Sequence, residues 1–296
     1  MVSHIYRVHT IQIITRETFP QVQSPGCPEV KVSIVIPALN EEERIGRVLE
    51  QIPYNWLPEA EVIVVDNGSS DDTARVAASK GARVVREPRR GYGIATRTGF
   101  SKATGDIIVT MDADGGHWPG DLLKVLRPVA EGSSMVAMGV RIHSFPHGMK
   151  IRRFFGNVML AKVFDALYGG HLGDVQCGFR AIHRKALNKL RLSQDGMQLT
   201  TELLIELKER GIPICPVQVR QVPTDHSHIR EAGDFIEHVS LMLRRFPSYW
   251  SARIRNRHWA VAQTRKFVGM NGHSRTDNRG RDEVKQQILD SLRKIA

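Results

Sequence analysis

The sequence predicts an α/β protein whose mostly parallel sheet is flanked by helices. Short β-branched runs alternate with amphipathic helical segments from residue 31 to Asp112, and such alternation is typical of parallel strands joined by right-handed crossovers. Each of these strands is followed by a polar or glycine-rich loop. The chain has 296 residues, of which 41% are hydrophobic, so it is long enough to bury a large core.

The first half of the chain carries the clearest strand and helix patterns. Pro37 is expected to stop the first strand, and Asn40 is expected to cap a helix that begins at Glu41. Gly81 closes the second helix. The expected elements are strands at 31–36, 61–66, 82–85 and 107–112, and helices at 41–52, 71–80 and 93–103.

The second half is expected to complete a single domain with a basic helical extension. Its predicted elements are a helix from Pro119, a strand at 134–138, a basic amphipathic helix at 149–168, an extended segment at 177–182, a helix at 199–209, a strand at 212–219 and a helix through 235–246. We divide the chain into an extension or linker at 1–29, the α/β domain at 30–230, a basic amphipathic helical segment at 231–270 and a polar, charged tail at 271–296.

The composition indicates a cytoplasmic protein with anionic partners. Cys27, Cys177 and Cys215 are too scattered for a disulfide framework or a metal motif, which fits a reducing compartment. We find neither a signal peptide nor an apolar run of membrane-spanning length. The net charge of +11 favours nucleotides, phosphates, an anionic membrane surface or nucleic acid as partners.

Much of the positive charge lies at 241–270, where tryptophans are interleaved with arginine and lysine. The basic residues are Arg244, Arg245, Arg253, Arg255, Arg257, Arg265 and Lys266, and no acidic residue accompanies them. The stretch fits a solvated basic helix, a nucleic-acid patch or a membrane-surface anchor. Because tryptophan and arginine together suit the bilayer interface, we hypothesise reversible membrane association at the cytoplasmic face.

Two carboxylates, Asp112 and Asp114, follow the fourth strand. Residues two apart on a strand face the same side, so the two charges would converge where open α/β sheets bind ligands. Hard oxygen ligands suit Mg²⁺ or Mn²⁺, so both aspartates are candidate metal ligands. Taken alone, the pair fits solvated turn aspartates equally well.

The loops after the other three strands favour the metal-ligand interpretation of Asp112 and Asp114. They contain Pro37–Glu41, Asp66–Ser70 and Arg89–Gly93, and parallel strands would place all of them beside Asp112 at one sheet edge. Carboxylates, glycine-rich backbone, arginines and a metal pair are the expected partners of a nucleoside diphosphate. The sequence contains neither G-x-G-x-x-G nor a P-loop, so a dinucleotide fold and a Walker kinase are not indicated.

These motifs together resemble family 2 glycosyltransferases of the GT-A fold, and within that family the polyprenyl-phosphate (dolichyl-phosphate, mannose-type) sugar synthases. The resemblance covers about residues 30–245. It rests on Ile-Pro-Ala-Leu-Asn-Glu, Val-Asp-Asn-Gly-Ser, Met-Asp-Ala-Asp and the segment Asp174–Arg180. It implies an inverting transfer of a hexose from a GDP- or UDP-linked sugar to a polyprenyl phosphate, assisted by Mg²⁺ or Mn²⁺.

The resemblance also implies roles for individual residues. On the donor side it implies Pro37, Leu39, Glu41, Asp66, Gly93 and Asp112. The catalytic set would be Asp112, Asp114, Gln176 and Arg180, with Asp112 and Asp114 at the metal. The acceptor phosphate would meet Arg141, Arg152 and Arg153.

The chain departs from the family pattern at three places. Asn67 stands where many relatives carry Asp, and Gly115-Gly116 replaces bulkier residues after the Asp pair. His228 stands where lysine is usual, which leaves Arg220, His226 and His228 as candidates for the donor phosphates.

Several residues also have purely structural interpretations. His117, His171 and His183 are interpreted as surface or loop histidines rather than ligands. Glu202 fits either an acid in the first turn of a helix or a contact to the donor loop. Arg152 and Arg153 equally fit a solvated helix face.

Two rival functions stay open. A soluble hydroxyl acceptor, such as a secondary metabolite or an osmolyte precursor, would need a base, for which Asp174 is the candidate. A non-catalytic basic module is the second alternative, and it would bind no nucleotide sugar.

Overall fold

The computed structural model describes residues 30–141, 151–222 and 231–270, with the backbone alone at 151–154, 231–232 and 255–270. These residues form two compact units. The first comprises 30–141, 177–189 and 214–222, and the second comprises 151–176, 190–213 and 231–270. The predicted extension at 1–29 and tail at 271–296 lie outside the described residues.

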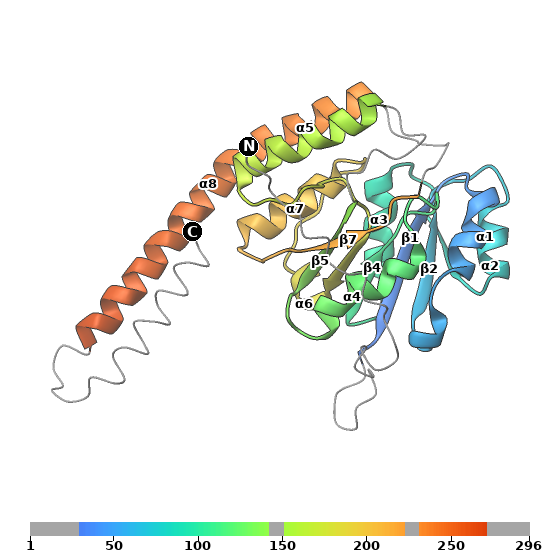
Figure 1. The fold of residues 1–296 in the computed structure, drawn as a ribbon, viewed down its shortest axis with the longest axis horizontal. Coiled ribbons are helices and arrows are strands. Elements are labelled where there is room, and N and C mark those ends of the chain that lie inside the picture. The colour runs from blue at the N-terminus through green and yellow to red at the C-terminus, as the bar shows by residue number, and fades with distance from the viewer. Residues whose placement is uncertain (1–29, 142–150, 223–230, 271–296) are drawn as a thin grey trace, which may run out of the picture. The chain divides into compact units, whose positions relative to one another are not determined.

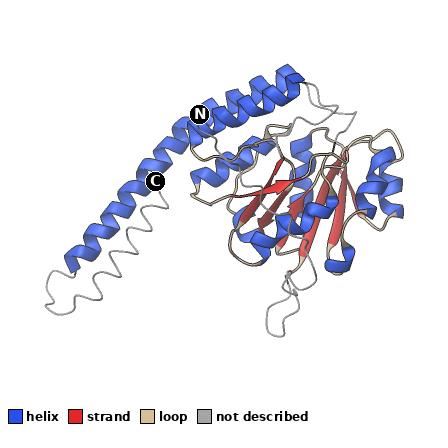
Figure 2. Ribbon diagram, viewed as in Figure 1, coloured by secondary structure: helices blue, strands red, loops and turns tan. Residues whose placement is uncertain are grey.

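The first unit is built on one seven-stranded sheet (Figures 1 and 2). Its strand order is β3-β2-β1-β4-β6-β5-β7. Only β6 runs against its neighbours, β4 and β5, so the predicted mostly parallel α/β sheet is confirmed. The strands are β1 (Val32–Ala38), β2 (Glu61–Asp66), β3 (Arg83–Arg86), β4 (Ile107–Thr110), β5 (Val136–Arg141), β6 (Arg180–His183) and β7 (Cys215–Val219).

Helices cover both faces of this sheet (Figure 1). On one face, Ile34 and Ile36 of β1 belong to the same buried cluster as apolar residues of α1 and α4. On the other face, α3 comes so close that a side chain at Gly99 would lie 2.2 Å from a Val35 methyl group. The helices of this unit are α1 (Glu42–Glu50), η1 (Tyr54–Trp56), α2 (Thr73–Ser79), α3 (Tyr92–Lys102), η2 (Pro119–Asp121), α4 (Leu122–Ala130) and α6 (Arg184–Leu187).

Two details around the first strand correct the sequence prediction. Pro37 does not stop β1, which continues to Ala38. The Val35 carbonyl accepts a hydrogen bond from the β4 side, and the Ala38 carbonyl accepts one from the β2 side. Because the sides alternate along a strand, Pro37 faces the β4 side. It lies beyond the last residue pair between β1 and β4, so its missing N–H removes no hydrogen bond from the sheet. Asn40 is not the helix cap either. It adopts a left-handed φ of 54°, and its Oδ1 accepts from the Ser70 amide at 2.9 Å.

The second unit consists of three helices, α5 (Ile151–Tyr168), α7 (Leu199–Glu209) and α8 (Glu231–Met270). Figure 1 shows α5 alongside α8. Tyr168 is buried between the two helices, because its hydroxyl donates to the Met242 carbonyl and its carbonyl accepts from the Tyr249 hydroxyl, both at 2.7 Å. Phe164 and Phe246 extend this aromatic core. No helix among the described residues is long and apolar enough to span a bilayer.

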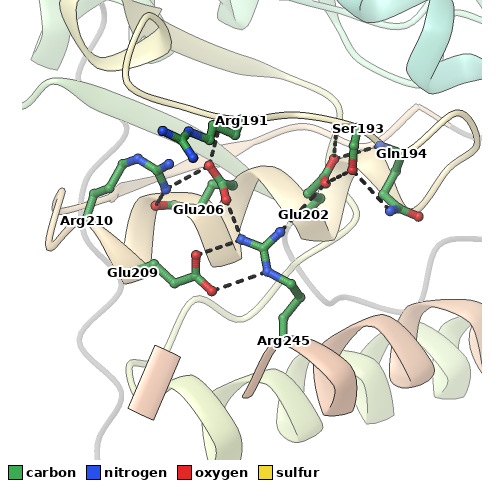
Figure 3. Close-up of polar contacts among 8 residues, drawn as sticks. All are labelled: Arg191, Ser193, Gln194, Glu202, Glu206, Glu209, Arg210 and Arg245. Atoms are coloured by element: carbon green, nitrogen blue, oxygen red, sulfur yellow. Dashed lines mark hydrogen bonds and ion pairs between the residues drawn. The ribbon is translucent and has the colours of Figure 1, made fainter. Parts of the chain in front are cut away.

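An ion-pair network joins α7 to α8 (Figure 3). Arg245 of α8 reaches Glu206 and Glu209 of α7, the latter at 2.7 Å, and lies 4.0 Å from Glu202. Glu209 and, to a smaller extent, Glu206 hold the pKa of the Arg245 guanidinium above its ordinary value, despite the opposing effect of burial. One of the seven basic residues counted at 241–270 is thus neutralised inside the unit rather than presented to a partner.

Candidate active site

The four parallel strands β3, β2, β1 and β4 end at one edge of the sheet, as the sequence predicted. Of the residues expected on the donor side, Pro37 is buried as the last residue but one of β1, and Leu39 is partly exposed just after the strand. Glu41 is buried, and its backbone amide donates to Thr73 Oγ1 at 2.7 Å. Gly93 is buried in the first turn of α3. These residues therefore lie at the same sheet edge, where Glu41 is held by its backbone amide and Gly93 has no side chain.

Asp66 and Asn67 organise the loop after β2. Asp66 is buried, and its Oδ1 accepts from the Ser69 amide at 3.0 Å. The Asn67 amide group donates to the carbonyls of Glu87 and Arg89 at 3.2 and 2.7 Å and accepts from the Gly91 amide at 2.7 Å. An aspartate could not donate to those carbonyls. The Asn67 departure thus has a structural reason, because this side chain fastens the loop after β2 to the loop after β3.

Glu87 holds the loop after β3. Its carboxylate accepts from the Arg89 guanidinium at 3.1 Å and from the Thr98 hydroxyl at 2.8 Å. These contacts lower the pKa of Glu87 to about 2. The loop is therefore fixed by a carboxylate that remains ionised throughout the physiological range.

Asp112 lies two residues beyond β4 and is held by groups from other elements. The Tyr92 hydroxyl donates to its Oδ1 at 3.2 Å, and Nδ1 of His117 lies 3.4 Å from its Oδ2. Burial and the Asp112 carboxylate raise the pKa of Tyr92, with Arg180 acting in the opposite direction, so Tyr92 remains a donor. Gly178 packs directly on this carboxylate, since a side chain there would lie 2.4 Å from Oδ1.

His117 lies in the loop after β4, as one of the two sequence interpretations had it, but it is not at the surface. It is 3% exposed, its Nε2 lies 3.4 Å from Cys177 Sγ, and its ring packs on Phe179. The sequence showed Asp112 and His117 five positions apart but not the Cys177 contact. Together with Tyr92, His117 is a neighbour of Asp112 that the sequence reasoning did not place there.

Asp114 is held within its own loop. Its Oδ1 accepts from the Gly116 amide at 2.8 Å, across Gly115 with a φ of +76°. A side chain at Gly115 would be strained, and one at Gly116 would lie 3.0 Å from the Asp114 carboxylate. The two glycines that depart from the family pattern therefore serve the tight turn that orients Asp114.

The two residues expected near the reacting centre fall into different units. Arg180 is buried in β6, opposite Thr110 of β4, and its Nε donates to the Cys177 carbonyl at 2.9 Å. Gln176 belongs to the second unit, where its backbone amide donates to Asp174 Oδ1 at 3.0 Å. Asp174 itself is buried. Arg180 therefore lies in the same unit as Asp112, whereas Gln176 is described within the second unit.

The arginines assigned to the acceptor phosphate are described only in part. Arg141 ends β5 in register with Val219 of β7 and is partly exposed. Arg152 and Arg153 lie in the first turn of α5, and their side chains lie outside the described residues, as do His226 and His228.

The carboxylates of Asp112 and Asp114 fit a divalent cation that takes its remaining ligands from a substrate. Asp112 is 30% exposed and Asp114 is partly exposed, and both supply hard carboxylate oxygens. Among the described residues, no group of three or more His, Cys, Asp or Glu side chains could hold a metal alone. A cation at this edge would therefore need further oxygen ligands, which a diphosphate provides.

Comparison with known proteins agrees with this geometry. The family model described as glycosyl transferase family 2 matches residues 33–191. The uncharacterized glycosyltransferase Rv0539 of Mycobacterium tuberculosis is 47% identical over 68% of this chain and 90% of its own length. The dolichyl-phosphate hexose transferase of Haloferax volcanii is 32% identical over 64% of this chain and 81% of its own. The low-salt glycan biosynthesis hexosyltransferase Agl6 of the same organism is 30% identical, and the chain spans only 54% of its length.

Solved structures of glucosyl-3-phosphoglycerate synthase from Mycobacterium tuberculosis share the fold. The complex with UDP is 26% identical, with a TM-score of 0.61 over 74% of this chain and 80% of that one. The complex with Mn²⁺, UDP-glucose and phosphoglyceric acid is 25% identical, with a TM-score of 0.60 over 73% and 79% of the two chains.

Proposed function

The chain belongs to glycosyl transferase family 2, and from this membership we propose that it moves a hexose from a nucleotide-diphosphate sugar to a polyprenyl phosphate. The observation that carries the proposal is the convergence of Asp112 and Asp114 with the loops after β1, β2 and β3 at one sheet edge. The related synthase bound to UDP-glucose and Mn²⁺ supports a uridine nucleotide and a divalent cation as partners.

On the donor side, Asp114 is the direct metal ligand and Asp112 supports the metal or the ribose. Asp112 is oriented by Tyr92 and His117, whereas Asp114 is oriented by its own turn. A divalent cation there would neutralise charge on the departing diphosphate. Asp66, at the end of β2, is assigned to the base side of the nucleotide.

On the acceptor side, a phosphate monoester is already an anion near pH 7, so it needs positioning cations rather than a base. Arg141, Arg152 and Arg153 are the proposed cations, and Gln176 and Arg180 complete the reacting centre. Relatives named dolichyl-phosphate hexose transferase and UDP-N-acetylglucosamine--dolichyl-phosphate N-acetylglucosaminyltransferase, the latter from Methanococcus voltae, support a lipid phosphate acceptor.

A soluble acceptor is the second candidate function. The solved structure of the synthase with UDP-glucose and phosphoglyceric acid favours it. With a hydroxyl as the nucleophile, a carboxylate must take its proton, and the buried Asp174 is the candidate for that role.

Membrane contact is a further part of the proposal. Trp250 and Leu243 of α8 are 53% and 57% exposed, and the exposed Arg244 adjoins Leu243. Flotation with anionic vesicles should recover the protein, and Trp250→Ala should weaken that recovery. If anionic and neutral vesicles recovered equally little protein, this contact would be excluded.

The transfer assay separates the two candidate acceptors. Purified protein is incubated with UDP-glucose, UDP-N-acetylglucosamine or GDP-mannose, with Mn²⁺ or Mg²⁺, and with either a short polyprenyl phosphate or 3-phosphoglycerate. Product on the lipid supports the first candidate, and product on phosphoglycerate supports the second. No transfer from any donor, together with no thermal stabilisation by any of them, would refute both.

A further inference from the structure

Two helices of the second unit carry most of the apolar surface that the described side chains expose. Among those side chains, every large apolar one that is exposed, except Tyr54, belongs to α5 or α8. On α8 their exposed fractions lie between 42% and 66%, and the residues are Ile236, Leu243, Trp250 and Ile254. These four residues, which we call the α8 stripe, are spaced by seven, seven and four positions, so they lie on one face of the helix. An exposed apolar row of this kind marks an interaction surface.

The α8 helix packs on α5 and α7 through positions other than the stripe. Met242 and Tyr249 are buried, and both are hydrogen-bonded to Tyr168 of α5. On the α7 side, Nδ1 of the buried His238 lies 2.7 Å from the Thr201 hydroxyl. The packing of the three described helices therefore leaves the stripe to a further partner.

The segment that follows α8 has an apolar face of similar length in its sequence. Four apolar residues are spaced by four, four and three positions, which is the spacing of one helix face, namely Val284, Ile288, Leu292 and Ile295. This face covers eleven positions, as does the α8 stripe from Leu243 to Ile254, which is about 17 Å of helix in each case. Acidic residues precede the face and basic residues end it, as the helix dipole favours, at Asp282, Glu283, Arg293 and Lys294.

The connection between α8 and this segment is long enough to fold back. Residues 271–281 contain two glycines and no apolar side chain, which is typical of a loop. Fully extended, eleven residues reach about 36 Å, whereas the helical rise from Ile254 to Met270 is about 24 Å. The segment 282–295 can therefore return along α8 and lie antiparallel on the stripe. Because the connection keeps the segment at a high local concentration, it has an advantage over a second copy of the chain.

We propose that residues 282–295 form a helix that docks on the α8 stripe of the same chain and competes there with the membrane. The docking goes beyond the proposed function and does not depend on it. The competition rests on the proposed membrane contact, because Leu243 and Trp250 are also the residues assigned to the bilayer. The docked segment shields the stripe from lipid, and its displacement frees the stripe for the bilayer. Membrane binding is thus regulated by a segment of the protein itself.

Amide hydrogen exchange of the full chain tests the docking without donor or vesicles. In wild type, the amides at 284–295 should exchange about 10-fold or more below their intrinsic rates. Leu243→Asp should remove most of this protection, because it places a charge in the stripe. Tyr54→Asp is the matched control, since Tyr54 is an exposed apolar residue of the first unit. The docking is refuted if wild type shows no protection, if Leu243→Asp keeps it, or if it appears only at high protein concentration, which would assign the stripe to a second copy.

Flotation with anionic vesicles tests the competition. Ile288→Asp should raise the recovery of the protein about 3–10-fold over wild type, because it releases the segment from the stripe. Gln286→Asp is the matched control, since it adds the same charge on the polar side of the segment. If Ile288→Asp loses the exchange protection but floats no better than Gln286→Asp, the competition is refuted. If neither wild type nor any variant floats, the membrane contact and the competition both fail, whereas hydrogen exchange decides the docking by itself.

Discussion

The protein contains two acidic clusters that look alike in sequence and differ in what surrounds them. On α7, Glu202 and Glu206 are buried and face Arg245 of α8 (Figure 3). At the β4 edge, Asp112 is 30% exposed, and its neighbours include the Tyr92 hydroxyl and His117. The first cluster packs against a cation of its own unit, whereas the second lies partly exposed at the edge of the sheet.

The Glu202 carboxylate is also occupied by hydrogen bonds within the protein. Its carboxylate accepts from the Ser193 amide, the Ser193 hydroxyl and the Gln194 amide, at 2.7 to 2.9 Å. Such saturation fixes a loop and leaves little capacity for substrate. Of the two interpretations of Glu202, these contacts favour a structural role. A pair of acids therefore indicates a site only when its lone pairs remain accessible.

The largest expected effect is at the accessible cluster. Asp114→Asn should reduce kcat/KM for sugar transfer by about 10³-fold or more, because it removes the proposed metal ligand beside the leaving group. The free energy of unfolding should stay within about 0.5 kcal/mol of wild type, since asparagine has the size of aspartate and its Oδ1 can still accept from the Gly116 amide. Steady-state kinetics and urea unfolding check both, and near-normal turnover would overturn the assignment.

In the α7–α8 network, a substitution should lower the stability of the protein. Arg245→Met should cost about 2–3 kcal/mol of unfolding free energy, because it removes the charged hydrogen bonds to Glu206 and Glu209 and leaves the buried Glu206 with Arg210 as its cation. Arg244→Met, at the exposed neighbouring position, should change stability by less than about 0.5 kcal/mol. Urea denaturation of the two variants measures the contrast. Equal stability of both would mean that the α7–α8 network contributes nothing.

A smaller effect is expected where the loops after β2 and β3 meet. Asn67→Asp should destabilise the protein by about 2 kcal/mol at pH 7, because a carboxylate would face two carbonyls that now accept hydrogen bonds. The loss should shrink at acidic pH, where the new carboxyl group is protonated and can donate. Thermal melts at pH 7 and pH 5 test this, with the exposed Asn55→Asp as control. A pH-independent loss would contradict the explanation.

The smallest effect concerns Glu87 and acid. Its pKa falls from an ordinary value of 4.5 to about 2 in the folded state, so its stabilising contribution is present above pH 4.5 and is lost as the pH falls toward 2. Glu87→Gln should therefore flatten the decline of stability over that range. Unfolding midpoints from pH 5 to pH 2 measure it, with the exposed Glu59→Gln as control. If the midpoint fell with pH as steeply in Glu87→Gln as in wild type, Glu87 would not contribute to the loss of stability in acid.

Local pattern was sufficient for most of the fold. The β2 strand and the α7 helix occupy the predicted residues 61–66 and 199–209. The alternation of elements also implied the parallel edge that brings Asp66 and Asp112 to one side. These features follow from periodicity and from strand direction, which neighbouring residues encode.

Local sequence patterns did not predict the structural role of a residue where the same residue type fits two roles equally well. Asn40 has the chemistry of a helix cap and of a left-handed turn residue, and its contact with Ser70 selects the second. Arg245 has the same sequence context as Arg244, yet one lies in the α7–α8 network and the other is exposed. The difference is a matter of helix face, which only packing against α7 reveals.

The sequence by itself therefore determined the α/β class and the sheet edge that carries Asp112 and Asp114. Tertiary structure alone decided which charges are neutralised and which remain available. Arg220 lies 99 positions from Asp121, and Arg245 lies 36 positions from Glu209. Contacts of that separation leave no periodic trace in the chain, because they depend on how whole elements pack rather than on any neighbouring residue.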